Sequence, residues 1–246
     1  MQQKSTARRK TGLFVVEGCR ELLHCLESGY LVDTVFCCPS VLSAYGQLPE
    51  LPSGVRYVEV SPEVYQKMAY RGGTEGIVAE VRCRSLSLAD LRLGSSPLLV
   101  VVESVEKPGN LGAILRTADA AGADAVVVCD PLTDLYNPNL IRSSVGAVFS
   151  VPCVPCSSEE CIAYLRQHHI TILTAQLQDS RLYYDVDMRR PVAIVMGTES
   201  TGLSQQWRQA ADAHIQIPML GRIDSLNVSV SAAILLFEAV RQRHNH

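Results

Sequence analysis

Five consecutive apolar residues, Leu98 to Val102, constrain the fold of this chain more than any other segment. A strand that is apolar without alternation is typical of a parallel sheet, because helices cover both faces of such a sheet. Further apolar runs at residues 125–129, 170–175 and 191–196 are separated by segments with helical spacing. Strands that alternate with helices predict an α/β fold with a mostly parallel sheet and helices on both faces.

The first 84 residues predict a smaller α/β module of their own. Stretches of strand length occur at residues 11–17, 31–38, 55–60 and 77–83. Ser61-Pro62 is a strong start signal for a helix, since Ser can cap it and Pro fits its first turn. Residues 85–97 are polar and end in Gly94-Ser95-Ser96-Pro97. We therefore predict an N-terminal domain of residues 1–84, a linker of residues 85–97 and a second domain of residues 98–246.

Charge and cysteine content narrow the classes of function. The formal charge of −3 argues against a protein that coats nucleic acid without specificity, although Arg8, Arg9 and Lys10 form a local basic cluster. Only one CxxC pair, Cys153 and Cys156, occurs among nine cysteines, so we expect free thiols, a reducing compartment and no metal site. No apolar run reaches the roughly 18 to 20 residues of a membrane helix, and the basic N-terminus lacks the apolar core of a signal peptide. A cytoplasmic location is expected.

A polar turn and a helix follow the first apolar strand of the second domain. The turn contains Pro108-Gly109-Asn110, and Asn110 is expected at the N-cap of a helix that begins at Leu111. Arg116 lies six residues later, roughly 120° around a regular helix. The two side chains can meet only because a cap residue lies outside the regular turns and arginine is long. The simpler interpretation of Arg116 is a surface ion pair with Asp119.

Two more polar loops follow strands. Met196-Gly197-Thr198-Glu199 ends the strand at residues 191–196, and its glycine would let a ligand approach the backbone. Near the C-terminus, the short strand Ile215 to Ile217 leads into a loop that contains Pro218, Gly221, Asp224, Ser225 and Asn227, and then into an apolar helix. In open α/β sheets, loops at strand ends form the ligand crevice. This loop has more polar side chains than a turn needs, so we predict a ligand site there.

Together, the three segments resemble the motifs of the SpoU (TrmH-type) ribose methyltransferases of the SPOUT superfamily. The resemblance joins residues 108–118, residues 196–204, and Ile217-Pro218-Met219 with Ser225-Leu226-Asn227-Val228-Ser229, and it covers about Leu98 to Arg241. The N-terminal module resembles the small ribosomal-protein-like substrate-binding domain of these enzymes, through Arg9, Gly12, Phe14, Glu17 and Gly18. The resemblance implies an α/β trefoil-knot methyltransferase domain that uses S-adenosyl-methionine and works as a homodimer.

The resemblance also implies which residues form the site. Cofactor contacts are expected from Thr174, Gly197, Ile217 and Leu226. The residues expected around the reacting ribose 2′-hydroxyl are Arg116, Asn110, Glu199, Ser225 and Asn227. The hydroxyl must lose its proton during attack, but arginine is effectively always protonated. Our hypothesis is that Arg116 stabilises the developing alkoxide or a neighbouring phosphate, and that Glu199, or a water it holds, takes the proton.

The expected substrate is structured RNA. Large-subunit ribosomal RNA is favoured over transfer RNA, because the added N-terminal module is typical of family members that act on it. Candidate phosphate contacts are Arg8, Arg9 and Arg142. A transfer RNA ribose methyltransferase, a relative that methylates a base, and a catalytically silent RNA-binding protein are the alternatives. No membrane or metal partner is expected.

Overall fold

A computed structural model describes residues 5–69, 75–198 and 201–244 of the chain. Its internal contacts divide the chain into two compact units, and the division does not follow chain order. Unit 1 consists of residues 1–84 and 134–150, and unit 2 of residues 85–133 and 151–246. The sequence predicts a boundary after residue 84 but places residues 134–150 in the second domain, whereas these residues pack with unit 1. In the described part of the chain, no helix is long and apolar enough to cross a membrane.

Unit 1 is a four-stranded sheet with the order β1-β4-β2-β3. Its strands are β1 (Leu13–Glu17), β2 (Val32–Cys37), β3 (Arg56–Glu59) and β4 (Ile77–Arg82), and its helices are α1 (Ser5–Thr11), α2 (Cys19–Glu27), α3 (Pro39–Leu42), α4 (Pro62–Met68), α6 (Pro138–Ser144) and α7 (Ala147–Ser150). The strand β4 pairs antiparallel with β1 and β2, and β2 pairs parallel with β3. The side chain of Ser61 accepts a hydrogen bond from the N–H of Val64 (3.4 Å), which confirms the helix start predicted there.

Aromatic packing explains why residues 134–150 belong to unit 1. The ring of Phe14, fully buried in β1, stacks on Tyr136 at 4.2 Å and on Phe149 at 5.8 Å between centroids. Residues 138–150 form two helices, α6 and α7, rather than one. The break lies at Val145 and Gly146, whose φ angles are 56° and 90°. A Cβ at Gly146 would lie 2.7 Å from the ring of His24, so the close approach of α2 requires glycine there.

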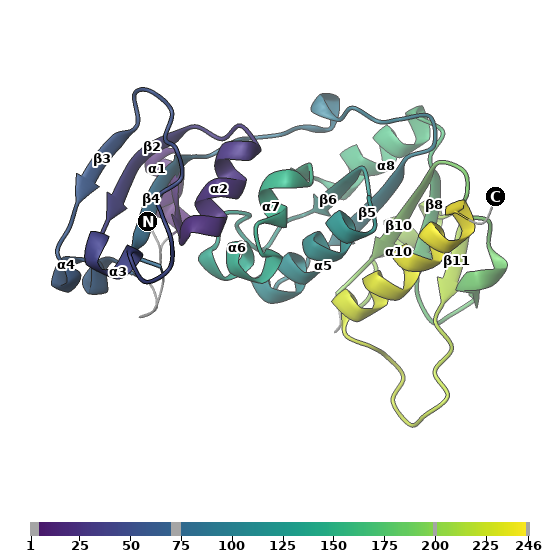
Figure 1. Cartoon of the computed structure of the whole chain (residues 1–246). Coiled ribbons are helices and arrows are strands. Elements are labelled where there is room, and N and C mark those ends of the chain that lie inside the picture. Colours follow the sequence, from purple (N-terminus) through teal and green to yellow (C-terminus); the bar gives the residue numbers. More distant parts are fainter. Residues whose placement is uncertain (1–4, 70–74, 199–200, 245–246) are drawn as a thin grey trace. The chain divides into compact units, whose positions relative to one another are not determined.

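Among the described residues, unit 2 contains a seven-stranded sheet with the order β7-β6-β5-β10-β8-β11-β9 (Figure 1). Its strands are β5 (Leu98–Glu103), β6 (Ala125–Cys129), β7 (Cys153–Cys156), β8 (Thr171–Ala175), β9 (Arg181–Leu182), β10 (Val192–Met196) and β11 (Ala213–Gln216). Every neighbouring pair is parallel. All residues of β5 are buried, which confirms the strand and the parallel sheet predicted from its apolar run.

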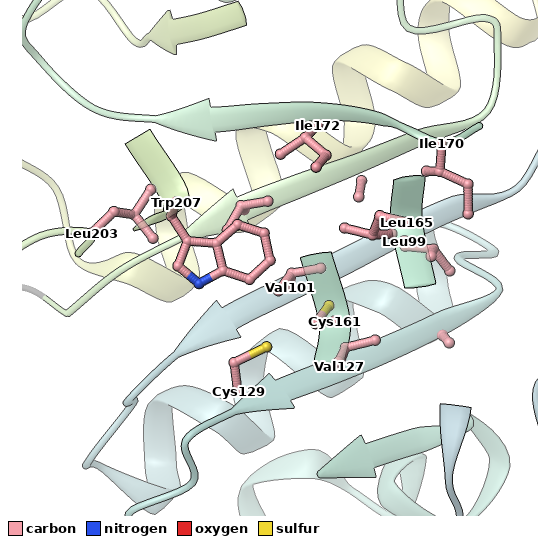
Figure 2. Close-up of a cluster of buried hydrophobic side chains, with 13 residues drawn as sticks. Leu99, Val101, Val127, Cys129, Cys161, Leu165, Ile170, Ile172, Leu203 and Trp207 are labelled. Carbon is pink, nitrogen blue, oxygen red and sulfur yellow. The ribbon is translucent and has the colours of Figure 1, made fainter. Parts of the chain in front are cut away.

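Helices cover both faces of this sheet. They are α5 (Pro108–Ala120), α8 (Ser158–Gln167), α9 (Gln205–Ala210) and α10 (Val228–His244), with two short 3₁₀ turns at Leu88–Asp90 and Tyr183–Asp185. The helices α5 and α10 pack on each other (Figure 1), and so do α8 and α9. A hydrophobic core cluster lies under α8 and α9, where alternate residues of β5 and β6 meet Leu165 and the fully buried Trp207 (Figure 2).

Candidate active site

A pocket opens at the carboxyl ends of the neighbouring strands β8 and β10. Its volume is about 330 Å³, which lies within the range of small-molecule sites. The lining consists of Ala175, Gln176, Leu177 and Gln178 after β8, Met196, Gly197, Thr198, Gly202, Leu203 and Arg208 around the end of β10, and Asp224, Ser225, Leu226, Val228 and Ser231 before and within α10. The loops that follow two different strands and the start of a helix therefore converge, as expected for a crevice at strand ends.

The wall after β10 is a tight turn held by backbone contacts. The N–H of Gly202 donates to the carbonyl of Thr198 (3.1 Å), and the two residues form a β-bridge. A Cβ at Gly197 would lie 2.3 Å from the carbonyl group of Gly202. From the sequence, Gly197 was expected to let a ligand approach the backbone. In the structure, the Gly202 backbone occupies the space where a Cβ would be. Glu199 lies outside the described residues.

A buried carboxylate anchors the far end of this turn. Glu103, at the end of β5, is 6% exposed, and its Oε2 accepts a hydrogen bond from the N–H of Ser204 (2.8 Å). Ser204 is the N-cap residue of α9, so Glu103 satisfies one of the free amides at that helix start. Sequence reasoning missed this role, although a carboxylate that ends an apolar strand was a signal for it.

The pocket also holds a buried polar atom without a partner. The Oε1 atom of Gln176 is the one buried side-chain oxygen or nitrogen that lacks a hydrogen bond among the described residues. The Nε2 of the same side chain donates to the carbonyl of Gln178 (2.9 Å), which fixes the orientation of the amide. A ligand donor, such as an amino or hydroxyl group, would satisfy Oε1. The apolar side chains of Met196, Leu203 and Leu226 line the same pocket. Apolar walls with one free acceptor fit the adenosine part of S-adenosyl-methionine.

The structure divides the residues predicted to contact the cofactor. Gly197 and Leu226 line the pocket, as does Ser225. Thr174 is fully buried just before the lining, and its Oγ1 lies 2.6 Å from Nδ1 of His214. Ile217 is half-buried after β11 and is not among the described residues of the lining. Gln176 and Arg208 were missed; the signal for Gln176 was its position directly after an apolar strand.

A hydrogen bond between two asparagines joins the motif at residues 108–118 to the C-terminal motif at residues 217–229. The Nδ2 of Asn227 donates to Oδ1 of Asn110 (3.1 Å), across 117 residues of sequence. Oδ1 of Asn227 accepts from the N–H (3.0 Å) and the hydroxyl (2.6 Å) of Ser229, so Asn227 also caps the start of α10. Asn110 was predicted at an N-cap, but it lies in the first turn of α5. The N-cap is Lys107, because Pro108 at the first helical position starts the helix three residues earlier.

Arg116 is an exposed residue of α5. It lies roughly 9 Å further along the helix axis than Asn110. The structure thus brings Asn110 and Asn227 together but does not place Arg116 among the described lining residues.

The three arginines predicted to contact RNA differ in exposure. Arg8 is 4% exposed in α1, and its guanidinium contacts Oδ2 of Asp134 at 2.7 and 2.8 Å. This ion pair engages the guanidinium within unit 1, and contact of Arg8 with RNA stays a prediction. Arg9 in α1 and Arg142 in α6 are exposed.

A parallel sheet with a cofactor-sized pocket at its strand ends, beside the linked Asn110 and Asn227, is the arrangement expected of the SPOUT-type methyltransferases that the motifs resemble. Comparison with known proteins gives the family. The chain belongs to the SpoU rRNA methylase family, whose model matches residues 97–237. Residues 1–79 match an MRM3-like substrate-binding domain. The fold class and the type of enzyme predicted from the motifs are therefore confirmed.

Several relatives cover most of the chain. It is 35% identical over 196 residues to a 23S rRNA (guanosine-2′-O-)-methyltransferase RlmB of Ralstonia nicotianae, covering 78% of this chain and 79% of the relative. It is 30% identical to a 23S rRNA (uridine(2479)-2′-O)-methyltransferase of Streptomyces viridochromogenes, covering 96% and 85%. Among solved structures, AviRb of the same organism with bound AdoMet matches with a TM-score of 0.87 at 27% identity, over 99% of this chain and 95% of that one.

Proposed function

We propose that this chain transfers a methyl group from S-adenosyl-methionine to a ribose 2′-hydroxyl of large-subunit ribosomal RNA. The observation that carries the proposal is the pocket at the ends of β8 and β10, together with the hydrogen bond that holds Asn227 to Asn110. Relatives that cover most of the chain are named as 23S rRNA 2′-O-methyltransferases, which supports the substrate class.

The cofactor supplies a methyl group that is already activated on a cationic sulfur. The protein therefore has to place the ribose hydroxyl in line with that methyl group, and good placement can lower a barrier by about 7–11 kcal/mol. Ser225 and Leu226 line the pocket, and Asn227 follows them at the start of α10. Three consecutive residues thus lead from the cofactor pocket to the Asn110–Asn227 pair, where we propose that the ribose binds.

The proton of the hydroxyl must leave during the reaction. Arg116 lies outside the described lining of the pocket, so we propose that its guanidinium stabilises the alkoxide or an adjacent phosphate once RNA is bound, and that Glu199, or a water held by it, accepts the proton. An Arg116→Lys variant should lose most of its single-turnover rate, because lysine lacks the planar fork of donors. A near-normal rate would exclude a role for the guanidinium shape. Glu199→Gln should alter the pH–rate profile, and an unchanged profile would exclude Glu199 as the base.

We propose that the active form is a homodimer. Val230 and Phe237, seven residues apart on one face of α10, are 46% and 48% exposed, and Leu220 in the preceding loop is 97% exposed. Exposed apolar side chains beside a site are typical of an interaction surface. A second copy that binds to these apolar side chains would also give the dimer a second Arg116. Sedimentation of the purified chain should give twice the monomer mass, whereas a Phe237→Glu variant should be monomeric.

Residues 1–84 are proposed to select the RNA. Arg9 of this segment and Arg142 of α6, which belongs to the same unit, are the proposed phosphate contacts. The cytoplasm is the expected location for an enzyme that acts on ribosomal RNA.

The decisive experiment combines binding and product mapping. Calorimetric titration with S-adenosyl-methionine should show one site per chain. Ribosomal RNA from cells that lack the gene should then gain one 2′-O-methylated nucleotide in the presence of the enzyme, located by nuclease digestion and mass spectrometry. A methylated base, or cofactor binding without any transfer, would contradict the proposal.

A further inference from the structure

Three cysteines that are distant in sequence meet in the core of unit 2. Cys129 ends β6, Cys156 ends β7 and Cys161 lies in the first turns of α8. Their Sγ atoms all lie within 4.8 Å of one another. Figure 2 shows Cys129 and Cys161 in the same core cluster, near Trp207. None of these thiols has a role in the proposed methyl transfer.

The CxxC pair in the sequence gave no signal for this cluster. Successive side chains of a strand point to opposite faces, so residues an odd number apart lie on opposite sides of the sheet. Cys153 and Cys156, three residues apart in β7, are therefore separated by the sheet. Cys156 instead pairs in register with Cys129 of the neighbouring strand, and α8 brings Cys161 over both.

The geometry of the three thiols suits a soft cation. Zinc–sulfur bonds of about 2.3 Å in a tetrahedral site place the sulfurs roughly 3.8 Å apart. Sulfurs that already lie within 4.8 Å of one another need to move by only about 1 Å to reach that arrangement. Two of the ligands are fixed by hydrogen-bonded strands and the third by a capped helix, so the site is preorganised.

The partial exposure of Cys156 gives an ion a route to the three thiols. Cys129 and Cys161 are fully buried, whereas Cys156 is partly exposed. The adjacent carboxylates of Asp130 and Glu160 accept hydrogen bonds from Ser158 and Ser157, including the bond from the Ser158 hydroxyl to Asp130 (2.6 Å). Because these carboxylates already accept hydrogen bonds at the start of α8, the fourth ligand of a bound ion would be a water molecule that enters beside Cys156.

We propose that Cys129, Cys156 and Cys161 form a binding site for a thiophilic cation of the Zn²⁺ class. The sequence predicts no metal site, so the structure assigns a property that spacing alone excluded. On binding, three Zn–S bonds form, and the three thiol protons pass to solvent. The ion would fasten β6, β7 and the start of α8. Ser158, in the same helix start, accepts a hydrogen bond from Nε1 of Trp207 (2.9 Å) and so connects this region to α9.

The test uses the full chain, reduced and stripped with a chelator. Co²⁺ is the spectroscopic probe, and we expect one equivalent to produce a thiolate charge-transfer band and the visible bands of a tetrahedral site. One equivalent of Zn²⁺ should abolish both. At Zn²⁺ concentrations near 100 times the Kd, the thermal midpoint should rise by about 5–10 °C.

Variants separate the cluster from other thiols. Cys156→Ser should lose the cobalt bands and the thermal shift, and its partly exposed position makes it the variant most compatible with folding. Cys153→Ser is the matched control, because it changes a cysteine of the same strand on the opposite face, and it should bind Co²⁺ normally. The proposal is overturned if Co²⁺ binds substoichiometrically without charge transfer, if both variants lose binding equally, or if the unreduced chain carries a Cys129–Cys156 disulfide and the reduced chain takes up no metal.

Discussion

Replacing Gln176 by methionine should change stability and cofactor affinity in opposite directions. A buried acceptor without a partner costs about 1–3 kcal/mol, and Oε1 of Gln176 is such an acceptor. Methionine has a similar length and no polar atoms, but it also removes the hydrogen bond from Nε2 to Gln178, a net loss of about 0.5–1.5 kcal/mol. The free energy of unfolding of the cofactor-free protein should therefore rise by about 1 kcal/mol.

Cofactor affinity should fall in the same variant. If a donor of S-adenosyl-methionine satisfies Oε1, the loss of that hydrogen bond costs about 0.5–1.5 kcal/mol, which is about 2- to 12-fold in Kd. Urea denaturation without cofactor and calorimetric titration with it measure the two effects. Gln167→Met, on an exposed residue at the end of α8, is the control and should change neither. A variant that loses stability, or that binds the cofactor as tightly as the parent, would refute the assignment of Oε1 as a cofactor acceptor.

Three further predictions concern the turn, the basic residues and acid stability. Gly197→Ala should lower the free energy of unfolding by about 3 kcal/mol or more in urea, because its Cβ meets backbone. Gly202→Ala should cost only about 1–2 kcal/mol, because at φ 67° its Cβ would meet nothing nearer than the Arg208 side chain at 3.9 Å. Arg8→Gln should lower the free energy of unfolding by about 1.5–3 kcal/mol, because it removes the ion pair with Asp134. Arg9→Gln should leave stability unchanged and reduce the slope of RNA affinity against salt concentration by about one. Equal slopes in Arg9→Gln and the parent would show that Arg9 does not contact a phosphate. A hydrogen-bonded guanidinium one turn further along α10 lowers the pKa of Glu238 below 4.5, so its contribution is complete above about pH 4.5 and is lost as the pH falls through the lowered value. Glu238→Gln should therefore lose less stability than the parent between about pH 6 and pH 3, as measured by urea midpoints at each pH.

The fold was largely predictable because its strongest signals are local. The apolar run at 98–102 became a fully buried central strand, as its lack of alternation predicts. Helix boundaries were less certain where two local signals compete. At the start of α5, the fixed φ of Pro108 prevailed over the capping preference of Asn110. The Val145-Gly146 break depends on the close approach of His24, which is more than 100 residues away and leaves no local pattern.

The sequence predicted the segments that form the site, but it did not predict the individual hydrogen bonds within it. Motif residues such as Gly197 and Leu226 do line the pocket. The free acceptor of Gln176 and the anchoring of Ser204 by Glu103 depend on which polar groups find partners after folding. The burial of Arg8 depends likewise on Asp134, which is 126 residues away. Such pairings are set by tertiary structure, so neither residue type nor spacing could reveal them.

The strand order of the unit 2 sheet has a consequence for folding during synthesis. The strand β10 lies between β5 and β8, so it separates strands made about 70 residues apart and joins the sheet after both are synthesised. The last part of the pocket, residues 224–231, is made later still. Pairings that span long sequence separations form slowly, because closing a long loop costs entropy before any contact is gained. A nascent chain can therefore build its N-terminal strands early, but it gains its cofactor pocket only when synthesis is nearly complete.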